Sequence, residues 1–240
     1  MKRRLLLIGC VAASSTFVLA GPVSGSMFGY TDLGTGSQQL ILNGGTITLN
    51  ASDSGWWDNT GANNPAITNY IVGFCSTGCT PYGPYENDFF VFSLDGVNDV
   101  TITSATLSIW NPSNGYDSTL PSEIYEVGSV STSIAMLEAG GSGDTAIYNA
   151  LASGTLWGSV TVNAATDGTQ VMITLNAAAI SAINANEGGQ LAFGGTLVDP
   201  TTGVPEPTGL LLSGTMLAGL AFVRMRGRSI IHRFPEVRRQ

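Results

Sequence analysis

A continuous apolar run, Phe89-Phe90-Val91-Phe92-Ser93-Leu94, is soon followed by an alternating one, Val100-Thr101-Ile102-Thr103-Ser104-Ala105-Thr106-Leu107-Ser108-Ile109-Trp110. The first has the length and composition of a buried strand. The second alternates apolar and polar side chains over 11 residues and stops at Asn111-Pro112, as a strand of a sheet does. Asp95-Gly96 supplies a turn between the two runs. The stretch therefore predicts two successive β-strands.

Shorter runs of the same kind recur on both sides of this stretch. They are Thr46–Leu49, Ile124–Val127, Ser159–Val162, Val171–Leu175 and Leu191–Phe193, and turn signals separate them at Asn114-Gly115, Asp167-Gly168 and Gly188-Gly189. Many short strands with such punctuation predict a mainly β fold, a sandwich or a barrel. A chain of 240 residues has room for one such domain plus targeting segments.

Two short helices are expected among the strands. Asp144 is placed to cap a helix over Thr145–Ala152, and Asn176 to cap one over Ala177–Ala185. Helices between strands suit a jelly-roll with elaborated loops. Residues Phe89 to Pro112 also resemble the jelly-roll domains of exported bacterial surface proteins, some of which are related to carbohydrate-binding modules.

The charged residues are unevenly distributed. All nine Lys and Arg lie at the two ends, the only His is His232, and no cationic side chain occurs between Leu5 and Val223. The same stretch holds 16 of the 17 acidic residues. Nucleic-acid binding needs Lys or Arg to displace phosphate counterions, so it is excluded for the body of the chain. Catalysis by Ser–His–Asp or Cys–His groups and a His-ligated metal site are excluded there for want of a His.

The first 26 residues are typical of a secretory signal. Lys2-Arg3-Arg4 forms a basic start, Leu5–Leu19 is apolar, and Val18-Leu19-Ala20 places small residues for cleavage after Ala20. A retained membrane anchor is the alternative. A lipoprotein signal ending at Cys10 is a further one, although its apolar run is short.

The C-terminal region has three parts in a fixed order. Val204, Pro205, Glu206 and Pro207 precede a hydrophobic run over residues 208–223, and Arg224, Arg226 and Arg228 follow it. A 16-residue run is shorter than the ~20 residues that span a bilayer comfortably. The arginines would stop transfer and keep their end cytoplasmic.

This order resembles the PEP-CTERM sorting signal of Gram-negative bacteria. The resemblance covers Val204 to Arg228 and implies an exosortase, a membrane processing enzyme, as partner. It also implies export in bacteria that often make exopolysaccharide. Two features depart from the pattern: Met225 and Gly227 interrupt the arginines, and a tail follows over residues 229–240. A plain C-terminal membrane anchor is the alternative interpretation.

The expected organisation has four parts. A signal peptide covers residues 1–26, and an exported β-sandwich domain covers residues 27–203. A sorting signal covers residues 204–228 and includes a transmembrane helix over residues 208–223. A basic cytoplasmic tail covers residues 229–240. The signal peptidase and the export machinery would act on the first part. The protein would be held in the inner membrane before processing and reach the cell surface or the extracellular space afterwards.

Cys75 and Cys79 are the only cysteines after the signal segment, and Ser76-Thr77-Gly78 between them supplies a turn. In an oxidising compartment we expect a disulfide between them. A metal site would need further thiols or histidines, which this part of the sequence lacks.

Four aromatic residues are candidates for glycan binding. Trp56 and Trp57 lie in a polar stretch rich in Asp and Asn, and Tyr82 and Tyr85 lie in a loop rich in Pro and Gly. An aromatic face can pack on the C–H groups of a sugar ring while carboxylates and amides bind its hydroxyls. The alternative is that one indole of the Trp pair caps the core and the other lies on the surface.

The acidic residues allow three further interpretations. Clusters such as Asp95 with Asp99 and Glu86 with Asp88 could hold Ca²⁺ through oxygen ligands, and the segment 140–144 resembles part of a Ca²⁺-binding repeat. A solvated acidic surface explains them without an ion, and no cofactor is required. Two carboxylates at the right separation could also hydrolyse a glycosidic bond, although no pair is singled out.

The sequence thus predicts an exported, non-enzymatic protein of the cell surface or extracellular matrix, sorted by a PEP-CTERM-like signal. A carbohydrate-binding module for exopolysaccharide is the first alternative. A secreted glycoside hydrolase that acts through two carboxylates is the second.

Overall fold

A computed structural model describes residues 26–31, 38–75 and 83–198. The predicted signal peptide (apart from Ser26), the sorting signal and the tail lie outside this range, as do Cys79 and Tyr82. The internal contacts divide the chain after Thr202, and every described residue belongs to the first unit.

The described chain is mainly β, as predicted, with few helices. The strands are β1 (Met27–Thr31), β2 (Gln38–Leu42), β3 (Ile47–Asp58), β4 (Tyr70–Phe74), β5 (Tyr85–Ser93), β6 (Ala105–Asn111), β7 (Tyr116–Asp117), β8 (Glu123–Ser129), β9 (Leu156–Val162), β10 (Thr169–Thr174) and β11 (Gln190–Val198). The helices are α1 (Ile134–Ala139), α2 (Thr145–Ala152) and α3 (Ala177–Ala185). Sequence analysis anticipated α2 and α3 with these bounds but missed α1, which is only six residues long. None of the described helices is long and apolar enough to cross a membrane.

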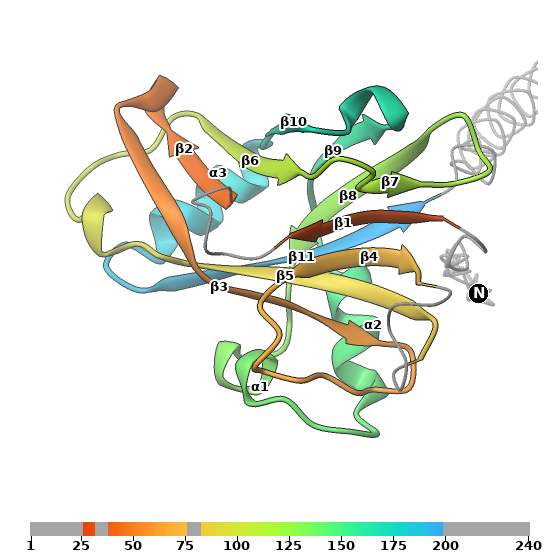
Figure 1. The fold of residues 1–240 in the computed structure, drawn as a ribbon. Helices are drawn as coiled ribbons and strands as arrows, with labels where there is room; N and C mark the ends of the chain where they lie inside the picture. The colour runs from red at the N-terminus through yellow and green to blue at the C-terminus, as the bar shows by residue number, and fades with distance from the viewer. Residues whose placement is uncertain (1–25, 32–37, 76–82, 199–240) are drawn as a thin grey trace, which may run out of the picture. The chain divides into compact units, whose positions relative to one another are not determined.

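The strands form one curled antiparallel sheet in the order β10-β6-β2-β3-β5-β11-β8-β9, and β4, β1 and β7 extend it from β5. The long strand β3 connects two layers because its first part pairs with β2 and its second part with β5. A bulge between Ala51 and Asp53 marks the change of partner and lets the strand bend. Figure 1 shows β2, β6 and β10 in one layer, β4, β5 and β11 in the other, and α1 and α2 below the second layer.

The predicted buried strand 89–94 corresponds to β5, at the centre of the sheet. Phe90 and Phe92 point into the main core between the layers, whereas Phe89 and Val91 point into a second cluster with residues of α1 and α2. Both faces of β5 are therefore covered, which explains why this run is continuously apolar instead of alternating.

The alternating run 100–110 is only partly a strand. The structure begins β6 at Ala105, so the prediction of a strand over residues 100–104 is wrong. The backbone N–H of Ile102 donates to Oδ1 of Asn184 on α3, and its carbonyl accepts from Nδ2 of the same side chain. Oδ1 of Asn43 accepts from the backbone N–H of Thr103. Distant asparagine side chains thus take the place of a neighbouring strand.

The two predicted helix caps differ in outcome. Oδ1 of Asn176 accepts hydrogen bonds from the N–H groups of Ala178 and Ala179, 3.0 and 3.1 Å away, which confirms the cap of α3. Asp144 stands at the N-cap of α2, but its side chain makes no capping hydrogen bond, so that part of the prediction is wrong.

Asn176→Ala should therefore destabilise the protein by about 1 kcal/mol, because two N–H groups at the start of α3 lose their acceptor. Asp144→Ala is the matched control and should change stability by less than half as much. Urea unfolding followed by circular dichroism measures both. Equal losses in the two variants would show that the cap contact contributes nothing.

Candidate functional site

The two adjacent tryptophans lie in the interior. Trp56 is 4% exposed, packs with Ile71 and Cys75, and donates from Nε1 to Oδ1 of Asn69 at 3.1 Å. Trp57 is 1% exposed and donates from Nε1 to the carbonyl of Leu137 in α1 at 3.2 Å. Neither indole presents a face to solvent, so the expectation that this pair stacks on sugar rings has no support from the structure.

The other predicted site residues are only partly described. Tyr85 is half-buried, and its ring packs on Phe74 with the ring centroids 5.2 Å apart. Cys75 is buried, but Cys79 lies outside the described residues, so the disulfide stays a prediction. Tyr82, the motif Val204–Pro207 and the three stop-transfer arginines also lie outside them.

One pair of carboxyl groups lies where β3 and β5 are neighbours, because Asp58 stands opposite Glu86 in the ladder. Asp58 is fully buried and accepts four hydrogen bonds of 2.6–2.9 Å, from the N–H and hydroxyl groups of Thr60 and the N–H groups of Ala62 and Gly83. Its carboxylate therefore holds two loops in place. Burial, followed by the negative charge of Asp58, raises the pKa of Glu86 to about 8.

A third buried carboxyl group lies farther along β5. Asp88 is fully buried, and the hydroxyl of Tyr125 on β8 lies 2.9 Å from each of its oxygens. Burial raises the pKa of Asp88 to about 8, so this group holds its proton at neutral pH. Gly195 faces the pair closely: a Cβ atom there would lie 2.0 Å from Oδ1 of Asp88 and 2.2 Å from the Tyr125 hydroxyl. Only glycine fits beside this hydrogen bond.

These acids are poorly placed for chemistry on a substrate from solvent, because Asp58, Glu86 and Asp88 are all 1% exposed or less. Among the described residues, no group of three or more His, Cys, Asp or Glu side chains could hold a metal ion. At the other acidic cluster, Asp95 accepts a hydrogen bond from the Ser93 hydroxyl at 2.8 Å.

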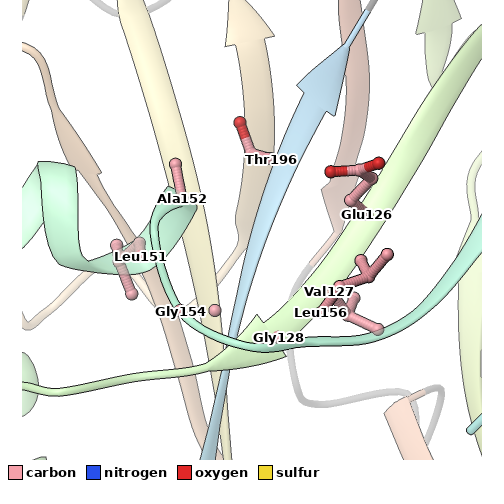
Figure 2. A pocket seen from close by; sticks show the side chains of 9 residues that line it. Glu126, Val127, Gly128, Leu151, Ala152, Gly154, Leu156 and Thr196 are labelled. Atoms are coloured by element: carbon pink, nitrogen blue, oxygen red, sulfur yellow. The ribbon is translucent and has the colours of Figure 1, made fainter. Parts of the chain in front are cut away.

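A small, shallow hollow lies where the end of α2 meets β8, β9 and β11. Figure 2 shows Glu126 and Thr196 on one side of it and Leu151 and Ala152 on the other. Burial raises the pKa of Glu126, whose carboxylate is the only charged group among the lining residues. The hollow is smaller than most small-molecule sites and offers few convergent polar groups.

The outer side of the layer formed by β2, β6, β10 and the first part of β3 has a different chemistry. Opposed residues of antiparallel strands share a face, and the ladders place Gln170 opposite Trp110, Met172 opposite Ser108, Ser108 opposite Gln39, and Gln39 opposite Asn50. We call this surface the neutral face. Its side chains are Thr48 and Asn50 on β3, Gln39 and Ile41 on β2, Thr106, Ser108 and Trp110 on β6, and Gln170, Met172 and Thr174 on β10.

The inward residues of the same strands, such as Leu40, Leu107, Ile109 and Ile173, belong to the main core. Trp110 is half-buried on the opposite side, and Met172 is 50% exposed. Nε2 of Gln170 donates to the Ser108 hydroxyl at 2.6 Å, and Nε2 of Gln39 donates to Oδ1 of Asn50 at 3.1 Å. These two hydrogen bonds orient the amide groups of Gln170 and Gln39.

Sequence reasoning missed Trp110 as a candidate, although a signal was present. Trp110 continues the polar phase of the alternating run, Thr106-x-Ser108-x-Trp110, while Leu107 and Ile109 occupy the apolar phase. A large aromatic residue in the outward phase of a strand can present a ring beside the polar groups of that face.

Comparison with models of known protein families and with curated protein sequences found no match to this chain.

Proposed function

We propose that the chain is an exported, non-enzymatic protein of the cell surface or extracellular matrix, sorted through its PEP-CTERM-like C-terminus. The observation that carries the proposal is the order of three parts at residues 204–228: the motif Val204–Pro207, the hydrophobic run and the arginines. An exosortase-type enzyme would cleave near the motif and release the body from the inner membrane.

The fold supports a body that works outside the cell. The last described strand, β11, ends at Val198, shortly before the motif, so the sorting segment follows a completed β domain. We take the curled antiparallel sheet to be a β-sandwich of the jelly-roll type that exported surface domains use. The core between its two layers and the lack of cations in the body suit a soluble, acidic domain.

The buried carboxyl groups support a non-enzymatic role. A glycoside hydrolase needs two carboxyl groups facing a substrate, about 5 to 9.5 Å apart. Asp58 and Glu86 are the neighbouring pair, but both are buried, and Asp58 is occupied by four hydrogen-bond donors. A carbohydrate-binding role is the second candidate, and the neutral face favours it.

Sorting is tested by locating the mature C-terminus in a host that carries an exosortase. Mass spectrometry after digestion at Glu and Asp should find the wild-type protein cut near Pro207 in the surface fraction. Glu206→Ala should leave most of the protein uncut in the inner membrane, because the motif is altered. Glu187→Ala, which changes an exposed acid of the body, should be processed normally. Finding residues 233–240 attached to the surface protein would reject sorting and leave a simple anchor.

A further inference from the structure

The neutral face stands out because of its charge. The four strand segments that build it, Gln38–Leu42, residues 47–50, Ala105–Asn111 and Thr169–Thr174, contain no Asp, Glu, Lys, Arg or His. The rest of the described chain carries 13 acidic residues and no base. A surface that only had to keep this protein soluble would be expected to carry acids as well.

The polar groups of the neutral face are amides and hydroxyls. Gln39, Asn50 and Gln170 each offer both donors and acceptors, and threonine and serine hydroxyls offer one donor and two acceptor lone pairs. Vicinal sugar hydroxyls likewise donate and accept, so such side chains can bind them without any charge. The hydrogen bonds Gln170–Ser108 and Gln39–Asn50 hold the amides in place, which lowers the entropic cost of binding.

Trp110 adds an aromatic surface at one end of this array. Gln170 lies directly across the ladder from it. Ser108 lies two residues away on the same strand and face, but it is only 2% exposed and serves to hold the Gln170 amide. An indole packs well against the C–H groups of a sugar ring, and neighbouring amides can reach the hydroxyls on its rim. The row Met172–Ser108–Gln39–Asn50 crosses three inter-strand spacings, about 14 Å, which is enough for a short run of sugar rings.

We infer that the neutral face, with Trp110 as its aromatic contact, is a binding site for an uncharged polysaccharide. The acidic body restricts the ligand: a polymer rich in carboxylate or sulfate would be repelled by a protein with no cation on its described surface. The inference deepens the proposed function, because a matrix protein that binds its own polysaccharide needs such a surface. Trp110 thus takes the role of glycan contact that the sequence had suggested for Trp56 and Trp57, both of which are buried.

Retention in native affinity gels tests the site. The full-length chain in mild detergent is run through gels that contain hydroxyethylcellulose, mixed-linkage β-glucan, xyloglucan or dextran, and through gels that contain alginate. At least one uncharged polymer should retard the protein, and alginate should not. Trp110→Ala should weaken the retarding interaction about tenfold or more. Gln170→Leu should weaken it less, because one amide among several is lost.

Three controls separate binding from folding. Trp110→Phe keeps a flat ring and should retain most of the affinity. Met136→Ala removes an apolar side chain that is 49% exposed on α1, outside the neutral face, and should bind like the wild type. Circular dichroism and the melting temperature must show that Trp110→Ala is folded; if it is not, the comparison of Gln170→Leu with Met136→Ala replaces it.

The inference is overturned if no uncharged polymer retards the protein, if alginate does so equally well, or if folded Trp110→Ala binds like the wild type. Self-association that Trp110→Ala abolishes, without retention by any glycan, would instead assign the face to a second copy of the chain. None of these results bears on the C-terminal processing assay, so the binding site and the sorting proposal fail separately.

Discussion

Raising the pH from 5 to 8 should lower the melting temperature of this protein by about 15 °C or more. Asp88 and Glu86 are buried carboxyl groups whose pKa values are raised from 3.8 and 4.5 to about 8. In the unfolded chain both groups lose their protons near pH 4, whereas in the folded protein they keep them to about pH 8. The stability that these two groups contribute is therefore fully present below pH 4 and is lost as the pH rises toward 8. The loss is on the order of 4 kcal/mol for one such group over three pH units.

The acidic surface contributes in the same direction, so the buried groups need variants of their own. Asp88→Asn keeps a neutral group of the same shape beside the Tyr125 hydroxyl and should flatten the pH dependence clearly. Asp95→Asn changes an exposed acid and should leave the slope almost unchanged. Differential scanning calorimetry at fixed ionic strength measures all three proteins. A melting temperature that is constant or rises between pH 5 and 8 would contradict the assignment.

Phe193→Ala should destabilise the protein by about 3–5 kcal/mol, a large part of the stability of a typical domain. Phe193 is fully buried on β11, a strand that pairs with both β5 and β8. Its ring meets Trp157 and Phe92 edge-on, with centroid distances of 4.8 and 5.6 Å. Removing it leaves a cavity that the strands around it cannot close, because their ladders hold them in register.

Phe74→Ala is the matched control, since Phe74 is only partly buried and packs mainly on Tyr85. It should lose less than half as much free energy of unfolding. Urea unfolding monitored by far-UV circular dichroism measures both variants. A loss below 1 kcal/mol for Phe193→Ala, or one equal to that of Phe74→Ala, would show that the main core is not organised around this ring.

The elements that were predicted well have local causes. The run 89–94 is apolar at every position but one, and α2 and α3 have short helical patterns after Asp144 and Asn176. Strand and helix periodicity, turn residues and the Asn176 cap act within a few residues, so they are visible in one sequence. The mainly β class followed from the number of such strands.

The elements that were predicted wrongly have distant causes. Residues 100–104 alternate like a strand. Their backbone groups, however, bond to the side chains of Asn43 and Asn184, which lie far away in the sequence. Asp144 stands where a cap is expected, yet its side chain makes no such bond. Local pattern cannot show which partner a backbone group finds after folding.

The tryptophans show most clearly the difference between what local sequence predicts and what tertiary contacts decide. Polar neighbours made Trp56 and Trp57 resemble surface residues, but Trp57 is covered by α1, and Trp56 packs against β4. Alternation alone placed Trp110 on the polar side of its strand. Whether that side faces solvent depends on which sheet faces the helices cover, and α2 packs on β11, β5, β3 and β8. Side-chain direction is a local property of a strand, whereas exposure depends on contacts between segments far apart in the chain, and only the tertiary structure specifies those contacts.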